Sequence, residues 1–348
     1  MAKNRTETHP VAATWSASDS INLELSPKPY TITEMDIDVY ATVNTGATPG
    51  AYNDLWDRII STLSLTGRGK TYFAFSNARA MRHFNRFIVK QPRRPAPIAA
   101  SQTGATAHVG YKIHFGVNPS NPFDLTAGIP PAESGNLSLT GTWGAAAAPG
   151  SGYTITAASM YVTLHGVMPE AGDAASQYLP RAFPIWSQRT PTPVATSSRY
   201  ATQDNIPAGG FLHSLLVMTF NGTNLPRDDG VLGSIQLYAQ TEAREIIKYD
   251  VWKIAEIMTQ SRYRVDPYFD DEIAEAGATT VPSAVPSDKG LVWLQLVDYA
   301  TKGNALYGAD LRNVSTGDLQ LRYGVDDATG VEMHVVYRKY ELNPAFGS

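Results

Sequence analysis

The stretch SNARAMRHFNRFIVK, residues 76–90, has a counterpart in DVWKIAEIMTQSRYR, residues 250–264, and this pair decides the fold class. Each stretch follows an alternating apolar segment and has helical spacing over more than two turns. Ser76 and Asp250 are residue types that favour the N-cap position of a helix. The pattern therefore predicts two short helices, each of which begins directly after a strand.

The two predicted helices align residue by residue at an offset of 174. The predicted buried face consists of Ala80, His83 and Phe84, which align with Ile254, Ile257 and Met258. The predicted exposed face consists of Arg79, Arg82, Arg86 and Lys90, which align with Lys253, Glu256, Gln260 and Arg264. Because the second exposed face is mixed, the basic stripe belongs to the first helix alone. This favours a subunit contact, or a basic surface facing a membrane or genome, over a nucleic-acid reader.

Most of the remaining apolar residues lie in short alternating runs, for example MDIDVYATV (residues 35–43), KTYFAF (70–75) and LVWLQLV (291–297). Such runs, separated by turns rich in Gly, Pro, Asn and Asp, are typical of half-buried antiparallel strands. An all-β fold with two helices follows. Short, regularly spaced strands favour sandwiches or barrels over parallel α/β folds.

The order of strands, turns and helix is the same in both halves of the chain. The lengths differ in turns: the loop GAAAAPGSG (residues 144–152) is shortened to DDATG (326–330) in the second half. Self-similarity of this length indicates a duplicated domain. We predict an N-terminal arm at 1–16, disordered before assembly, a first domain at 17–169 and a second at 170–348, with about eight strands and one helix per domain.

Composition narrows the class of protein. The 348 residues exceed the roughly 250 to 300 at which one hydrophobic core stops growing, so two cores are expected. The absence of Cys excludes disulfides and thiolate metal sites. Because no stretch is apolar enough for a signal peptide or a membrane span, we expect a soluble protein made in the cytoplasm. The net charge of −4 argues against non-specific nucleic-acid binding over the whole surface.

Motifs for catalysis and cofactor binding are absent from the sequence. It contains no Gly-rich phosphate loop, no His-Glu-x-x-His helix, no Gly-x-Ser-x-Gly elbow and no Cys nucleophile. The seven His residues are scattered, mostly inside strand patterns, where packed or surface imidazoles are common. We therefore predict no enzymatic activity, no catalytic residue, no cofactor and no metal site.

Two tandem eight-stranded sandwiches, each with a helix after a strand in its second half, resemble the double jelly-roll major capsid proteins of tailless icosahedral viruses, such as adenovirus and the membrane-containing bacteriophages. The resemblance extends over about residues 17–348 and rests on architecture and repeat. It implies a helix between the sixth and seventh strands of each roll, so that TYFAF (71–75) and REIIKYD (244–250) are sixth strands, and YKIHF (111–115) and VWLQL (292–296) are seventh strands. It also implies a structural protein of the virion capsid, a pseudo-hexagonal homotrimer that tiles an icosahedral shell.

An uneven distribution of charge supports assembly independently. Residues 58–123 contain ten basic and no acidic residues, whereas residues 227–275 contain eleven acidic and six basic ones. Opposite signs on equivalent surfaces of the two domains favour head-to-tail contact between subunits, mainly through register and association rate. The candidate subunit or inner-surface contacts are Arg79, Arg82, Arg86, Lys90, Arg93, Arg94, Asp270, Asp271 and Glu272.

This interpretation sets the expected partners. They are further copies of the chain in a trimer, neighbouring capsomers, penton or minor capsid proteins, and an internal membrane or genome on the basic surface, with no small-molecule substrate. Two alternatives remain open. A double jelly-roll amidase similar to the peptide N-glycanases requires acidic residues on facing strands, and the acidic residues here concentrate in turns and connectors. A carbohydrate-binding or host-attachment protein requires exposed aromatic residues, and Trp143, Trp186, Trp252 and Trp293 lie in separate elements.

Overall fold

The chain is mostly β-structure and divides into two compact units. Our computed structural model describes residues 3–8, 13–25, 28–49, 54–89, 91–92, 98–118, 121, 123–169, 178–196, 198–221, 227–262, 289–296 and 307–346. Among these described residues, strands make up 51% and helices 9%. Unit 1 consists of Met1–Trp186, Val265–Val285 and Leu342–Ser348, and unit 2 of Ser187–Arg264 and Pro286–Glu341.

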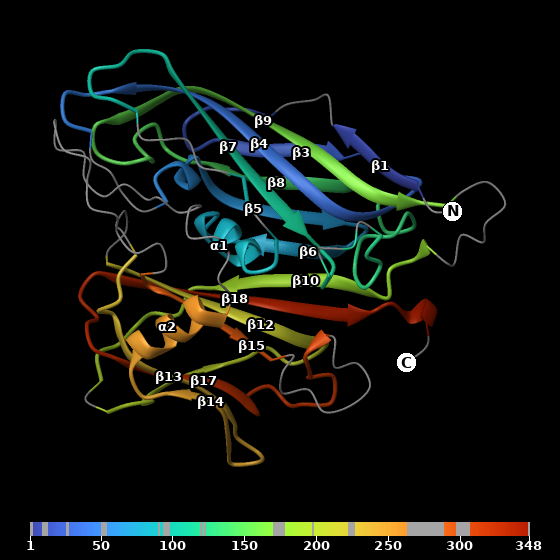
Figure 1. Cartoon of the computed structure of the whole chain (residues 1–348), viewed down its shortest axis with the longest axis vertical. Helices are drawn as coiled ribbons and strands as arrows, with labels where there is room; N and C mark the ends of the chain where they lie inside the picture. The colour runs from blue at the N-terminus through green and yellow to red at the C-terminus, as the bar shows by residue number, and fades with distance from the viewer. Residues whose placement is uncertain are drawn as a thin grey trace. The chain divides into compact units, whose positions relative to one another are not determined.

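The first roll has two antiparallel layers (Figure 1). Its strands are β1 (Lys3–Thr8), β2 (Ala13–Thr14), β3 (Ser20–Leu25), β4 (Thr31–Thr45), β5 (Ile60–Gly67), β6 (Lys70–Phe75), β7 (Ala105–His114), β8 (Leu137–Trp143) and β9 (Tyr153–Met168). One layer has the order β1-β9-β4-β7, with β2 also paired to β9, and the other has the order β3-β8-β5-β6. The 3-10 helix η1 (Trp56–Ile59) precedes β5, and α1 (Arg79–Arg86) joins β6 to β7.

The second roll repeats this arrangement. Its strands are β10 (Ala182–Arg189), β11 (Thr202–Asn205), β12 (Phe211–Asn221), β13 (Leu232–Ala239), β14 (Arg244–Tyr249), β15 (Leu291–Gln295), β16 (Ala309–Asp310), β17 (Leu319–Val325) and β18 (Val331–Leu342). The layers have the orders β10-β18-β12-β15 and β11-β17-β13-β14, and α2 (Trp252–Arg262) joins β14 to β15. The short 3-10 helix η6 (Pro344–Phe346) follows β18.

The two rolls share one topology, and the predicted double jelly-roll fold is confirmed. In each roll the last strand, β9 or β18, lies between strands from the start of the roll, as Greek-key connections require. The strands that flank the helices are the predicted ones. Counted along the chain, α1 follows the sixth strand of its roll but α2 follows the fifth, because β10 alone stands where the first roll has both β1 and β2.

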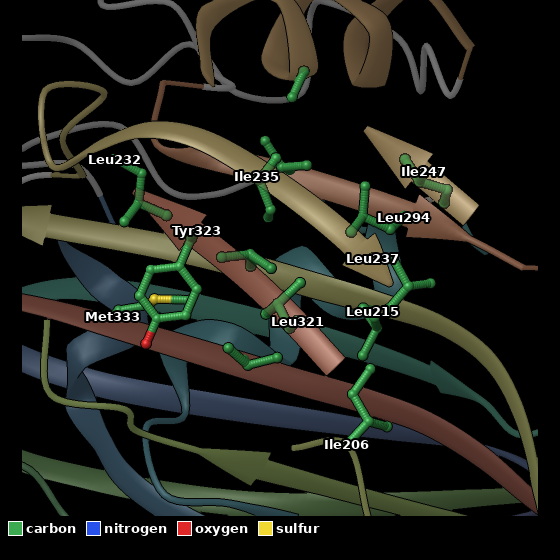
Figure 2. Close-up of a cluster of buried hydrophobic side chains, with 14 of the residues drawn as sticks. Ile206, Leu215, Leu232, Ile235, Leu237, Ile247, Leu294, Leu321, Tyr323 and Met333 are labelled. Atoms are coloured by element: carbon green, nitrogen blue, oxygen red, sulfur yellow. The ribbon is translucent and has the colours of Figure 1, made fainter. Parts of the chain in front are cut away.

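Alternating side chains produce both cores. In β3, Ile21, Leu23 and Leu25 are buried while the residues between them are exposed, as a strand with one wet face requires. In the second roll, Figure 2 shows Leu215 and Met333 from one layer beside Leu237 and Leu321 from the other. Burial of apolar area, at about 25 cal/mol per Å², is therefore what holds the layers together.

Two local predictions were wrong. The N-terminal arm contains strand β1, paired with β9 from Lys3↔Met168 to Thr8↔Thr163, because KNRTET can complete the edge of an existing sheet. Neither Ser76 nor Asp250 caps its helix as predicted. Helix α1 begins at Arg79, whose N–H donates to the Asn77 side chain at 3.0 Å. The Asp250 carboxylate accepts from the Tyr200 hydroxyl at 2.7 Å. Residues 170–177 lie outside the described residues, so the predicted boundary at 170 stays a prediction.

Candidate functional site

The basic stripe predicted on the first helix does not face solvent at its N-terminal end. Arg79 and Arg82 are 5% and 2% exposed, and every residue of α1 through Asn85 is buried. Arg86 is half-buried, with its guanidinium 5.0 Å from the centre of the Phe87 ring. The prediction of an exposed face was therefore wrong for Arg79 and Arg82.

Backbone carbonyl groups of the same unit satisfy the Arg82 guanidinium. Its Nη1 donates to the Gly110 oxygen at 2.8 Å, and its Nη2 donates to the Pro92 oxygen. Its Nε lies 4.0 Å from the Asp57 carboxylate. An arginine that binds carbonyl oxygens in this way needs no partner subunit, and it ties α1 to β7 and to the chain before it.

A second buried pair fixes α1 to the segment before β5. His83 Nε2 lies 2.6 Å from Asp54 Oδ1, and both side chains are fully buried. Asp54, Asp57 and His83 offer three donor atoms within 4.8 Å of one another, as a metal site would. However, Arg82 already supplies positive charge beside Asp57 and His83 is bonded directly to Asp54. The geometry is that of a buried network of polar and charged side chains that holds η1 against the helix.

The second helix has its buried and exposed faces in different places from those predicted. Trp252, Ala255, Glu256 and Thr259 are buried, whereas Ile254 and Ile257 are 50% and 53% exposed. An offset of 173, in place of 174, aligns Glu256 with His83. Hydrophobicity alone predicted the wrong face, because the buried side of α2 carries the Glu256 carboxylate and the Thr259 hydroxyl. Their partners lie in β15 and in the residue just before it.

Those partners surround the Glu256 carboxylate. Its Oε1 accepts from the Trp252 indole N–H at 2.8 Å and from the Gly290 N–H at 2.7 Å, and its Oε2 accepts from Lys253 at 3.0 Å. Burial raises the pKa of Glu256 more than these hydrogen bonds lower it. One turn later, the Thr259 hydroxyl accepts from the Trp293 N–H at 3.0 Å. Each roll thus anchors its helix through buried ionisable side chains: Arg82 and His83 in the first roll, and Glu256 in the second.

A row of carboxylates on β4, which sequence reasoning missed, lies on the outer face of this strand. Glu34, Asp36 and Asp38 alternate along the strand. Asp36 lies 2.8 Å from His165 on β9, and Asp38 lies 2.8 Å from His108 on β7. The expectation that the acidic residues concentrate in turns and connectors does not hold for this strand. The alternation in MDIDVY signals one polar face, but cross-strand register is needed to bring the His residues beside it.

The Glu34 end of this row is a continuous ion network. The Glu34 carboxylate lies 2.5 Å from Lys112 Nζ and 3.5 Å from His114 Nδ1, and His114 Nε2 lies 3.3 Å from Asp124. Burial opposes ionisation of Glu34 and of Asp124, but the hydrogen bond from His114 and the other donors outweigh it, so both pKa values are lowered. Glu34, Asp36 and His165 are spaced to ligate a metal ion, but Lys112 supplies the cation between the two carboxylates.

The remaining predicted contact residues stay a prediction. Lys90, Arg93, Arg94, Asp270, Asp271 and Glu272 lie outside the described residues. The four Trp residues considered for a glycan-binding platform, Trp143, Trp186, Trp252 and Trp293, are all at most 3% exposed. They are core residues, so they provide no aromatic surface for a sugar ring. Among the described helices, none combines the length and apolarity needed to cross a membrane.

Comparison with known proteins supports the fold alone. No family model matches the chain, and no curated protein matches it. Among solved structures, the major capsid protein (MCP) of Sulfolobus turreted icosahedral virus, STIV, is 17% identical with a TM-score of 0.73, covering 99% of this chain and 98% of that one. VP54 of PBCV-1 is 10% identical with a TM-score of 0.61, covering 99% and 96%.

A bacteriophage protein has the same likeness. The major capsid protein P2 of bacteriophage PM2 is 10% identical with a TM-score of 0.53, and the alignment covers 98% of each chain. All of these neighbours are double jelly-roll capsid proteins. This chain therefore has the double jelly-roll fold over nearly its whole length, and the resemblance inferred from its internal repeat is confirmed.

Proposed function

We propose that the chain is a viral major capsid protein that forms pseudo-hexagonal homotrimers, and that these trimers tile an icosahedral shell. The observation that carries the proposal is the presence in one chain of two jelly rolls with the same strand order and with a helix at the same place. Three copies of such a chain supply six equivalent rolls, so a three-fold assembly can have a nearly six-fold outline. The fold match over 99% of the chain to capsid proteins supports the same function.

The rest of the assignment follows from this proposal. The protein is made in the host cytoplasm and resides in the virion capsid, without enzymatic activity or a cofactor. Its partners are neighbouring capsomers, penton or minor capsid proteins, and an internal membrane or genome on a basic surface. The amidase alternative is not favoured, because the carboxylates on β4 are paired with His108, Lys112, His114 and His165. The glycan-binding alternative is not favoured either, because the four Trp residues considered for it are buried in the core.

The test is the assembly state of the purified full-length chain. Light scattering coupled to size-exclusion chromatography should give the mass of three chains, and electron microscopy should show particles with a pseudo-hexagonal outline. A compact monomer at every concentration, or a dimer with two-fold symmetry, would contradict the proposal.

The contribution of charge must be tested without Arg82. Reversal of Arg82 to Glu would unfold the first roll, because Arg82 is buried among backbone carbonyls. We therefore propose Arg86→Glu, Arg93→Glu and Arg94→Glu together, with the three Arg→Lys changes as the control that keeps the charge. If charge guides head-to-tail contact, the reversed variant should assemble more slowly at low salt and the Lys control should not. Equal assembly rates for both would remove charge from the explanation.

A further inference from the structure

The exposed large apolar side chains of the described residues are concentrated on α2. Seven such side chains are exposed in all, and four of them lie on this helix or directly before it. Val251, Ile254, Ile257 and Met258 are 43%, 50%, 53% and 37% exposed. The Val251 carbonyl accepts from the Ile254 N–H at 3.1 Å, so Val251 continues the first turn of the helix. We call these four residues the α2 stripe.

The α2 stripe has the pattern of a helix face that packs against another helix. Its spacing of three, three and one residues keeps the four side chains within about 120° of the helix circumference. The buried Trp252, Ala255 and Thr259 lie on the opposite side and face unit 2. Apolar residues at i, i+3 and i+7 are those that meet the partner in a pair of helices. The exposed side of α2 therefore has the residues of a helix–helix contact.

The equivalent side of α1 is covered within unit 1. At an offset of either 173 or 174, the counterparts of the α2 stripe fall within residues 80–85, which are all at most 2% exposed. Aromatic rings provide the cover, since the ring centre of Phe84 lies 5.2 Å from that of Trp186 and 5.8 Å from that of Phe75. One helix of the repeat has its outer side packed, and the other presents it to solvent.

The described residues offer the α2 stripe one match of its own kind. The other three exposed large apolar side chains, Tyr40, Phe123 and Val194, lie in three separate segments. The stripe exposes on the order of 300 Å² of apolar surface, which is comparable to the largest patch on a typical monomer. Apolar surface leaves water most favourably by contact with other apolar surface. Within the described part of the chain, the apolar surface of equal size on a second copy is the α2 stripe of that copy.

The order of the four residues makes the stripe complementary to itself. When two α2 helices pack antiparallel about a two-fold axis, Ile254 of each copy faces Ile257 of the other. Val251 of each copy then faces Met258 of the other. The centre of the contact is formed by four β-branched side chains, and at each end a long, adaptable Met packs against a small Val.

The charges near the stripe do not oppose a contact of like with like. Residues 227–262 contain six acidic and five basic residues, so two such surfaces meet with little net charge. The charges closest to the stripe are paired within unit 2: Lys253 with Asp229 at 2.7 Å, and Lys248 with Glu245 at 2.9 Å. Paired charges around an apolar centre form a polar rim. Two stripes together supply about 600 Å², under half of a standard interface of roughly 1,600 Å², so the contact is weak.

We propose that α2 pairs with α2 of a second copy of this chain, antiparallel about a two-fold axis. A ring of three copies is closed by head-to-tail contacts and contains no two-fold axis. The α2 pair therefore joins chains of two different trimers, and this inference goes beyond the proposed trimer to a contact that links one trimer to the next. Because each of the three chains carries one stripe, weak pairs add up in an assembly of many trimers.

A matched pair of substitutions tests the contact. Ile257→Glu places a charge at its centre, and Val194→Glu places one at an apolar position outside the stripe, where the side chain is 62% exposed. Sedimentation velocity at increasing concentration should show trimers that associate further for wild type and for Val194→Glu. Ile257→Glu should remain a single trimer to at least a tenfold higher concentration, with an unchanged melting temperature. Equal association of Ile257→Glu and wild type, or a wild type that stays a single trimer at every concentration, would overturn the inference and leave the proposed function intact.

Cross-linking identifies the occupant of the stripe. Ser261 is exposed one turn after Ile257, and since the chain has no Cys, Ser261→Cys carries a single thiol for a photoreactive maleimide. Labelled trimers of ordinary isotope content are mixed with unlabelled heavy ones, so that cross-links from light to heavy chains report contacts between trimers. Antiparallel pairing predicts such cross-links from position 261 to residues 248–252.

Two other results of this experiment would refute the α2 pair. They are cross-links between light and heavy chains that reach only the first roll, and the absence of any cross-link between light and heavy chains. If the chain forms dimers through α2 and no trimers, the proposed function fails and the α2 pair stands.

Discussion

Removal of the Glu256 carboxylate is the perturbation for which the structure gives the clearest magnitude. Glu256→Ala leaves two buried donors without an acceptor, the Trp252 indole N–H and the Gly290 N–H. Each buried donor left unsatisfied costs about 1 to 3 kcal/mol, which gives about 2 to 6 kcal/mol in total. Lys253 is half exposed and keeps Asp229 as a partner, so its loss adds little.

Relief of desolvation lowers this figure. Burial raises the pKa of Glu256, so the ionised carboxylate carries a desolvation cost in the folded protein. This cost is absent from the Ala variant. We therefore expect a loss in the lower half of the range, about 2 to 4 kcal/mol. Glu256→Gln is the matched control. Its Oε1 can accept from both donors, and only the ion pair with Lys253 is lost, so the expected cost is below about 1 kcal/mol.

The assay must separate unit 2 from unit 1, because a chain with two units need not unfold in one step. Hydrogen exchange measured by mass spectrometry on peptides from α2 and β15 gives this local readout, with urea unfolding as the global one. In Glu256→Ala, α2 and the start of β15 should exchange faster while β4 and β9 keep wild-type protection. If Ala and Gln at this position cost the same, hydrogen bonding by the carboxylate does not anchor the helix.

Three further predictions follow from the same geometry. Asp124→Asn should weaken the loss of stability at acid pH. The pKa of Asp124 is lower in the folded than in the unfolded chain, so its stabilising contribution is present at neutral pH and is lost as the pH falls through the folded pKa. Melting temperatures measured as a function of pH check this. Gly116→Ala should lower the melting temperature because its Cβ would lie 1.9 Å from Asp124 Oδ2, whereas Gly135→Ala, with no atom within 4 Å, should not. Phe84→Ala should cost about 3 to 5 kcal/mol in urea unfolding, and Met258→Ala less than about 1 in the monomer.

The repeat, the strands and the placement of the helices could be predicted from the sequence, because periodicity and turn residues are local signals. The strands TYFAF and VWLQL flank α1 and α2 as expected, since alternation of apolar residues over five positions is typical of a strand. What the sequence lacked was register. The carboxylates of β4 and the His residues of β7 and β9 are separated by 70 or more positions, and strand pairing alone brings them together.

Burial of polar side chains was the second property outside the reach of pattern reasoning. An Arg on a short helix is exposed by default, and Arg82 is buried because the carbonyl oxygens of Gly110 and Pro92 point at it. Likewise, Glu256 lies inward because the Trp252 indole and the Gly290 amide need an acceptor there. Such positions depend on donors and acceptors from other elements, and these have no signature in the residues of the helix itself.

The two helices of the repeat are anchored in the same way but differ in the exposure of their outer sides. Both are anchored by a buried ionisable residue, His83 with Asp54 in α1 and Glu256 with Trp252 in α2. A helix held in this way cannot turn about its axis without breaking a buried polar contact, so the side it presents outward is fixed. In α1 that side is already packed, and in α2 it is apolar and exposed. The same kind of anchoring therefore makes α1 an internal element and α2 a rigid surface. A rigid surface lowers the conformational-entropy cost of binding a partner.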